Sequence, residues 1–338
     1  MKQVIQIGPI NSKGGISSVM KSLILNAPSG FVINTINSHS DRSKLQMTLS
    51  WITSIFQLIK MLNNKNIDIV HIHVTHGLSW FRKLSIMKIC DFYGASTVIH
   101  IHSGKFDIFC KSAFGLFGYS VKKNLSKENR LIVILENRWK ILLDEWLPSN
   151  YEIIHNSSLP IERNIKNDEC INLLCLSRNG DAKNLSFCLE ILDYLSLKGF
   201  YAKLNITGLV ERDIKKYSHL EVKAHGWITN DEKNTLISVS DILISPSHYE
   251  GSSMSVIESL VSGLPVIVSD ASRQTVGSDE FVVQDMDVGL WCDKILEIKD
   301  NYQNMSNLAF KNGEKYGMSK SKMKWAKTYE KICKKLDP

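Results

Sequence analysis

Two glutamates, Glu250 and Glu258, stand eight positions apart in the stretch SPSHYEGSSMSVIESLVSGLPVIVSD, residues 245–270. Glu250 precedes a turn of glycine and serines, and Glu258 lies about two helical turns further on. The N–H groups that open a helix can bind an anion. We expect Glu250 to lie outside the helix, so the two carboxylates need not share one helix face. One of them can then hold a sugar hydroxyl and the other a ribose diol. Taken alone, each glutamate also fits an ordinary cap or surface charge.

A second candidate group is the pair of cations in LCLSRNGDAKNL, where Arg178 and Lys183 follow an apolar run. An arginine binds phosphate oxygens as a planar fork, and a lysine acts as a point charge. Together, on one loop at the end of a strand, they are suited to clamp a diphosphate. The alternative is an ordinary charged loop.

Glycines supply a third candidate, in GPINSKGGISSV near the N-terminus. Gly14 and Gly15 open a predicted helix directly after the first strand, where a backbone without side chains lets a phosphate come close. The spacing is neither G-x-G-x-x-G nor a Walker A loop, so dinucleotide and P-loop sites are disfavoured. A plain tight turn is the alternative.

Four histidines alternate along two predicted strands, His71 with His73 and His100 with His102. Alternation puts each pair on one face. No acidic or cysteine partner stands at ligand spacing, so we expect no metal site. His71, His73 and His100 fit core positions, whereas His102 ends its strand and should reach a ligand.

These candidates follow short apolar runs rich in Val and Ile. The predicted strands are 3–8, 67–74, 96–102, 130–135, 151–158, 171–177, 201–208, 221–228, 241–247 and 265–270, with helical patterns between them. Such runs indicate parallel sheets covered on both faces. A polar segment at 157–170 is typical of a linker. The sequence therefore predicts an α/β fold of two Rossmann-like, doubly wound parallel-sheet domains that face each other across a cleft, with ligands at the carboxyl ends of the strands.

The composition is typical of a globular protein and disfavours nucleic-acid-binding, secreted and membrane-spanning classes. The 338 residues are 43% apolar and 22% charged, with a net charge of +7. This mild basic excess favours an anionic partner, but without an aromatic stacking platform it does not favour nucleic acid. Seven cysteines with no C-x-x-C pair indicate reduced thiols. No stretch has the apolar length of a signal peptide core or a membrane span, so we expect a cytoplasmic protein.

The E-x7-E spacing from Glu250 to Glu258 resembles the signature of retaining glycosyltransferases of family 4. The resemblance runs along nearly the whole chain, through the glycine pair, His102, the Arg178–Lys183 loop and HGWI at 225–228. These enzymes have the GT-B architecture of two Rossmann-like domains. The resemblance implies an acceptor-side domain at 1–160, completed by a C-terminal helix at 318–338, and a nucleotide-sugar-binding domain at 161–317.

The resemblance also implies a role for each candidate residue. His102, Glu250, Arg178 and Lys183 would form the catalytic set: His102 contacts the donor sugar, and the two cations neutralise the leaving diphosphate. Donor binding would involve Gly14 and Gly15 at the diphosphate, Gly226, Trp227 and Ile228 at the nucleobase, Glu250 at the sugar, Gly251, Ser252, Ser253 and Met254 through main-chain N–H groups, and Glu258 at the ribose.

Family 4 enzymes usually need no divalent metal, and we expect no cofactor here, because the cations and helix dipoles supply the positive charge. The sequence departs from the family pattern at Ser157, where a glycine is common, at the Ser-Ser-Met run after Gly251, and at Gly208, which lacks a second glycine. These departures bear on the sugar and the loop shapes more than on the reaction class.

The expected partners are a nucleotide-sugar donor, with UDP preferred to GDP, and a saccharide acceptor. Aromatic and basic residues alternate in 78–94 and 105–130, which suits peripheral contact with an anionic membrane surface. The acceptor would then be lipid-linked, as on a polyprenyl diphosphate, in polysaccharide or O-antigen assembly at the inner face of the cytoplasmic membrane. Ordinary amphipathic helices are the alternative for both segments.

Two other functions stay open. A nucleotide-sugar epimerase would need a base at the sugar and would turn over donor without acceptor. The second is a binding or scaffold protein that has kept the fold and lost activity. The presence of Arg178, Lys183, Glu250 and Glu258 argues against it, because an inactive protein does not need all four.

Overall fold

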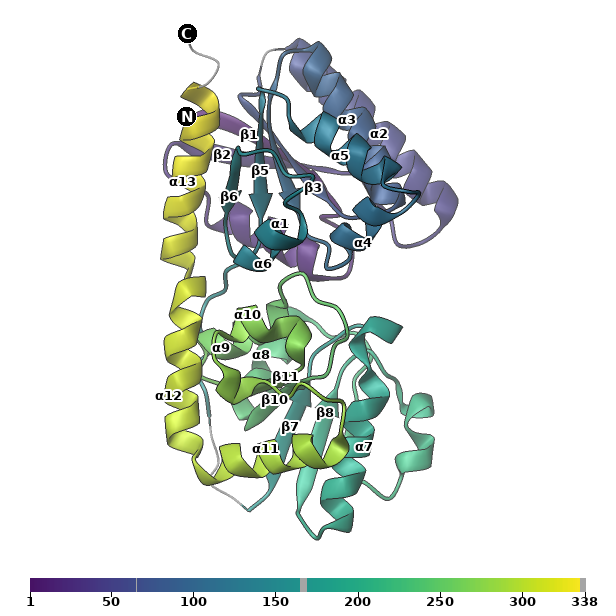
Figure 1. Ribbon diagram of the computed structural model, residues 1–338, viewed down its shortest axis with the longest axis vertical. Helices are drawn as coiled ribbons and strands as arrows, with labels where there is room; N and C mark the ends of the chain where they lie inside the picture. The colour runs from purple at the N-terminus through teal and green to yellow at the C-terminus, as the bar shows by residue number, and fades with distance from the viewer. Residues whose placement is uncertain (65, 165–168, 335–338) are drawn as a thin grey trace. The chain divides into compact units, whose positions relative to one another are not determined.

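Two units make up the chain in the computed structural model, which describes residues 1–64, 66–164 and 169–334. Unit 1 consists of Met1–Asn156 and the segment from Met318 onward, and unit 2 of Ser157–Gly317 (Figure 1). The change of unit at 156/157 lies four residues before the boundary expected from the sequence. Residues 165–168 of the expected linker and 335–338 of the expected last helix lie outside the described residues.

Unit 1 is built on a parallel sheet of six strands in the order β2-β1-β3-β4-β5-β6. Successive side chains of a strand point to opposite faces, so each strand contributes to two apolar layers. Ile5 and Ile7 pack in one layer, and Val4 packs in the other. The strands are β1 (Lys2–Gly8), β2 (Phe31–Asn37), β3 (Ile69–Val74), β4 (Ser96–Ile101), β5 (Arg130–Ile134) and β6 (Tyr151–Ile153).

Helices cover both faces of this sheet (Figure 1). One face packs against α2 (Lys44–Asn63), α3 (Leu78–Phe92), α4 (Phe106–Lys111), α5 (Leu116–Leu125) and α6 (Asn137–Leu142). The other packs against α1 (Gly15–Leu25) and α13 (Met318–Lys334). The last helix thus belongs to unit 1, and its Trp325 and Tyr329 are buried against the sheet.

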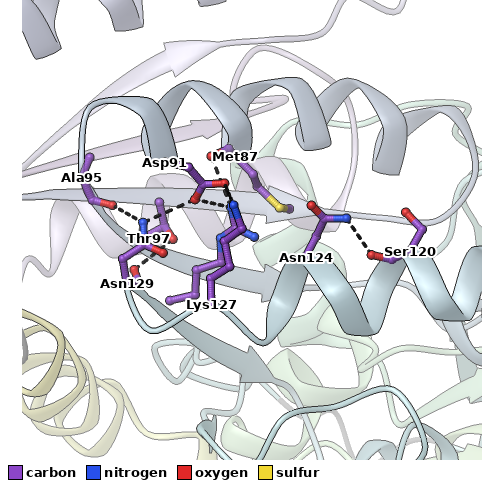
Figure 2. Close-up of polar contacts among 9 residues, drawn as sticks. Met87, Asp91, Ala95, Thr97, Ser120, Asn124, Lys127 and Asn129 are labelled. Carbon is purple, nitrogen blue, oxygen red and sulfur yellow. Dashed lines mark hydrogen bonds and ion pairs between the residues drawn. The ribbon is translucent and has the colours of Figure 1, made fainter.

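A buried ion pair ties α3 to β5 (Figure 2). Arg130 Nη2 lies 2.6 Å from Asp91 Oδ1 and also donates to the Met87 carbonyl oxygen at 3.2 Å. Lys127 and Asn129 contact the same carboxylate. The guanidinium is buried, and an opposite charge is what makes such burial tolerable.

Unit 2 has a parallel sheet of five strands in the order β11-β10-β7-β8-β9 and one continuous apolar core. Its strands are β7 (Ile171–Cys175), β8 (Ala202–Ile206), β9 (Val222–Ala224), β10 (Ile242–Ser245) and β11 (Val266–Val268). Its helices are α7 (Leu185–Leu197), α8 (Asn230–Val239), α9 (Met254–Val261), α10 (Arg273–Val276), α11 (Val288–Asp300) and α12 (Tyr302–Gly313).

The two doubly wound parallel sheets confirm the fold class expected from the sequence. The expected strand at 151–158 is shorter, since β6 ends at Ile153. All seven cysteines are buried thiols, as expected. Within the described residues, none of the helices combines the length and apolar character required to cross a bilayer.

Candidate active site

The first glutamate lies in the loop between β10 and α9, and the second lies inside α9. The helix begins at Met254 with Ser253 as its N-cap, so the prediction that Glu250 lies outside it is confirmed. Gly251, Ser252 and Ser253 form the turn directly before the helix. Since a helix start leaves N–H groups without intrahelical partners, this turn has the geometry of an anion site.

Glu250 is joined to one of the two predicted cations. Its Oε1 accepts from Lys183 Nζ at 2.5 Å and from Ser247 Oγ at 3.0 Å. Lys183 ends a short 3₁₀ helix, Asp181–Lys183, in the loop after β7. The carboxyl ends of β7 and β10 therefore bring a lysine and a glutamate together, with both side chains largely buried.

Arg178 lies on the same loop and is exposed. No ion pair of Arg178 occurs among the described residues, so its guanidinium is available to a ligand. The loop is held by Thr207, whose Oγ1 accepts from the Ser177 N–H at 2.8 Å. Gly208 contacts the loop backbone so closely that an added Cβ would lie 2.7 Å from Asn179 N and 2.8 Å from the Arg178 carbonyl carbon.

Glu258 is buried and pairs with a lysine that the sequence analysis did not single out. Its Oε1 lies 2.6 Å from Lys233 Nζ. Burial raises the pKa of Glu258, and Lys233 opposes that shift. Lys233 lies in the first turns of α8, which a capping box between Thr229 and Glu232 begins. The capping signal could have placed the helix, but an isolated lysine on it looks like any surface charge.

The predicted nucleobase segment follows β9. Gly226 has φ +62° and exchanges main-chain hydrogen bonds, donating to the Leu209 carbonyl at 2.7 Å and accepting from the Gly208 N–H at 2.7 Å. Trp227 is 51% exposed, and Ile228 is half-buried. Since parallel strands end at one edge of a sheet, these residues share that edge with Arg178 and Glu250.

In unit 1, Gly14 is the N-cap of α1, with φ +136°, a conformation that L side chains rarely adopt. An added Cβ at Gly14 would have no heavy atom within 4 Å, so the backbone there is open to a ligand. Gly15 is the first residue of the helix. Both glycines follow the carboxyl end of β1, and His102 follows that of β4 at the same edge of the sheet.

Hydrogen bonds connect His102 to the interior through His73 and Gln6. Gln6 Nε2 donates to the Met20 carbonyl oxygen at 3.3 Å, which leaves Gln6 Oε1 to accept from His73 Nε2 at 2.7 Å. A neutral His73 must then accept at Nδ1 from His102 Nε2, 2.8 Å away. This chain fixes the tautomer of His102 and leaves its Nδ1 as a hydrogen-bond acceptor for a ligand hydroxyl.

The four histidines form one cluster in which His71, His73 and His100 are buried and His102 is half-buried, and Trp325 of α13 packs against His71 and His100. His71 Nδ1 lies 2.9 Å from the Tyr329 hydroxyl, and His71 Nε2 lies 3.3 Å from His100 Nδ1. Burial lowers the pKa of His71 and of His102 to about 3, so both are neutral at pH 7.

A metal ion does not suit this cluster, although ligand atoms of His71, His73 and His100 lie within 4.8 Å of one another. The rings of His71 and His73 are stacked, with centroids 4.4 Å apart and planes 20° apart. Imidazole lone pairs lie in the ring plane, so two stacked rings cannot both point at one ion. The geometry favours a hydrogen-bonded cluster.

Comparisons with known proteins agree with this picture. The paired parallel sheets define a GT-B fold, and the chain is a glycosyltransferase. Residues 171–301, within unit 2, match the family described as Glycosyl transferases group 1.

A Klebsiella pneumoniae protein described as an uncharacterized 41.2 kDa protein in the cps region is 24% identical over 326 residues, which cover 86% of this chain and 87% of that one. Sucrose-phosphate synthase from Thermosynechococcus elongatus has a TM-score of 0.78 at 12% identity, covering 98% of this chain and 99% of that one. A mutant of S. aureus TarM in complex with fondaparinux, alpha-GlcNAc-glycerol and UDP has a TM-score of 0.63 at 18% identity, covering 82% and 59%.

Proposed function

We propose that this enzyme transfers a sugar from a UDP-sugar to a saccharide acceptor with retention of anomeric configuration. The observation that carries the proposal is the group of charges at the carboxyl edge of the unit 2 sheet. Arg178 is exposed there and has no ion pair with any residue that the structure describes, and Glu250 and Glu258 are each held by a lysine beside a helix start. A nucleotide sugar requires a cation for its diphosphate and a carboxylate for each of its two sugar rings, and Arg178, Glu250 and Glu258 supply these groups.

In the proposed reaction, the bond from the sugar C1 to the diphosphate oxygen breaks, and a bond from C1 to the acceptor oxygen forms on the same face. The acceptor hydroxyl gives its proton to the departing diphosphate. Arg178 and Lys183 neutralise that diphosphate, so no metal is needed. Glu250 holds sugar hydroxyls and is not a nucleophile, and His102 accepts a sugar hydroxyl at Nδ1.

Glu258 would bind the ribose, and the main chain at Gly226–Ile228 would flank the base. Oε1 of Glu258 already accepts from Lys233, so Oε2 is the oxygen proposed for the ribose hydroxyls. UDP as the nucleotide is supported by the structure of the TarM mutant, which is a complex with UDP. The cps-region relative supports a role in surface polysaccharide assembly. A cytoplasmic location and a lipid-linked acceptor are further parts of the proposal.

Peripheral membrane contact is a separate part of the proposal. It is supported by exposed apolar residues in unit 1, above all a stripe along α2 at helical spacing, formed by Leu45, Leu49, Ile52 and Phe56. Flotation with anionic liposomes tests it. We expect Phe56→Glu to reduce flotation, and Phe310→Glu, at an exposed apolar site of unit 2, to leave it unchanged. Wild-type protein that stays wholly in solution would contradict it.

Thermal shift with UDP, GDP, ADP and their sugar conjugates, first without metal and then with Mg²⁺, tests the transferase proposal. A nucleotide at about 100 times its Kd adds about 2.7 kcal/mol of stability. We expect UDP to stabilise the protein without metal, Glu258→Ala to weaken that effect, and Arg178→Ala mainly to lower turnover.

Exposed Glu221→Ala and Arg212→Ala are the matched controls. Unchanged UDP affinity in Glu258→Ala would exclude the ribose contact. Stabilisation by no nucleotide would favour an inactive binding protein, and donor conversion without acceptor would favour an epimerase.

A further inference from the structure

Lys83 is a buried cation in unit 1 that the proposed chemistry has not used. It lies on α3, is 5% exposed, and donates from Nζ to Ser38 Oγ. Among the described residues, no carboxylate lies within ion-pair distance of it. An ammonium has three donor hydrogens, so two remain for another acceptor.

The same helix also contacts a buried cation that does have a carboxylate partner. Asp91, two turns further along α3, forms an ion pair with the buried Arg130. A buried charge without such a partner costs several kcal/mol. Burial accordingly lowers the pKa of Lys83 to about 7. An anion beside Nζ would hold the ammonium in its charged form.

A second cation adjoins Lys83. Arg82 Nη1 lies 3.4 Å from His39 Nδ1, and the buried Arg82 Nε has no hydrogen-bond partner among the described residues. The nearby carboxylate of Asp41 is occupied: Oδ1 lies 3.2 Å from His39 Nε2, and Oδ2 accepts from the Lys13 N–H at 3.0 Å. Within the described part of the chain, neither Lys83 nor Arg82 therefore forms an ion pair with a carboxylate.

The position of the two cations points to a ligand. Ser38 directly follows β2, and its N–H donates to the Gly8 carbonyl at the end of β1, at 3.0 Å. Lys83 Nζ therefore lies at the carboxyl edge of the unit 1 sheet, the edge that also carries Gly14 and His102. In doubly wound sheets this edge is where ligands bind.

We propose that Lys83 and Arg82 form a subsite for an anionic group, a phosphate or a carboxylate, carried by the acceptor saccharide. The inference rests on the proposed transferase function, and it names the acceptor class as acidic. Lysine supplies a point charge and arginine a fork, a combination suited to both anions. The donor diphosphate is assigned to Arg178 and Lys183 of unit 2 and to the main chain at Gly14 and Gly15. Lys83 and Arg82 have no role in donor binding, so we assign this subsite to the other substrate.

Isothermal titration of the full chain, saturated with UDP, tests the subsite. Glycerol 1-phosphate is paired with glycerol, and glucuronate with glucose, so that the two arms separate phosphate from carboxylate. The variants are Lys83→Met and Arg82→Met. Lys88→Met, at an exposed lysine of the same helix, is the matched control. UDP binding is followed by thermal shift in every variant, which also shows that each one folds.

We expect one anion to bind while its neutral counterpart does not. Lys83→Met and Arg82→Met should each weaken that binding at least tenfold, and Lys88→Met should not. Equal anion affinity in Lys83→Met and wild type would overturn the subsite, as would a wild type that binds UDP but neither anion. If the anion binds through Lys83 and UDP does not bind at all, the subsite stands and the transferase proposal fails.

Discussion

Substituting Gly208 by alanine should displace the loop that carries Arg178. Gly208 has φ +86°, and an added Cβ would meet Asn179 N at 2.7 Å, with the Arg178 carbonyl carbon and Ser177 O at 2.8 Å. All three are main-chain atoms, so no rotamer change can relieve the contact. An L residue in this region costs about 1–2 kcal/mol, and overpacking adds about 1–3 kcal/mol. Gly208→Ala should therefore destabilise unit 2 by about 2–5 kcal/mol.

Gly199→Ala is the matched control for this substitution. Gly199 has φ +81°, but an added Cβ there would have nothing within 4 Å, so only the conformational cost of about 1–2 kcal/mol applies. The assays are urea unfolding, compared as midpoint shifts, and turnover with the donor identified by thermal shift. We expect Gly208→Ala to lose more stability and far more turnover than Gly199→Ala. Equal losses in the two variants would refute the reasoning that close approach to the Arg178 loop requires glycine.

Two further predictions concern ionisation. Lys233→Met leaves the buried Glu258 carboxylate without its partner and should cost about 3 kcal/mol at pH 8. The loss should be smaller at pH 5 than at pH 8, because burial raises the pKa of Glu258 and protonation removes the unpaired charge. Urea unfolding that gave equal losses at both pH values would contradict this prediction. The pKa of His71 and of His102 is about 3 in the folded chain and near 6.5 when unfolded, so the unfolded chain binds more protons below pH 6.5. As the pH falls from 6.5 to 5, the free energy of unfolding should decrease by up to about 1.4 kcal/mol per pH unit for each histidine. The decrease should be less steep in His102→Asn. A urea midpoint that did not change with pH would contradict this prediction.

The fold was predictable because strand and helix periodicity dominate this sequence. Strand β2 was not predicted, because it lies at an edge of the sheet and its sequence FVINTIN mixes exposed and buried positions instead of forming a continuous apolar run. The Glu250–Glu258 pair could be found from spacing, since the loop and helix follow from local sequence. Lys233 and Gln6 could not, because each acts through a partner distant in sequence. Lys83 did leave a signal, since it occupies the apolar stripe of α3 together with Trp80 and Met87.

The division of unit 1 between the two ends of the chain sets an order for its biosynthesis. Residues 157–317 are complete when the ribosome reaches Met318, but the sheet of unit 1 still lacks α13. Until Trp325 and Tyr329 emerge, the face with His71 and Val98 has no cover from that helix. All of unit 2 is therefore synthesised before α13, and the sheet of unit 1 gains the cover of that helix only afterwards.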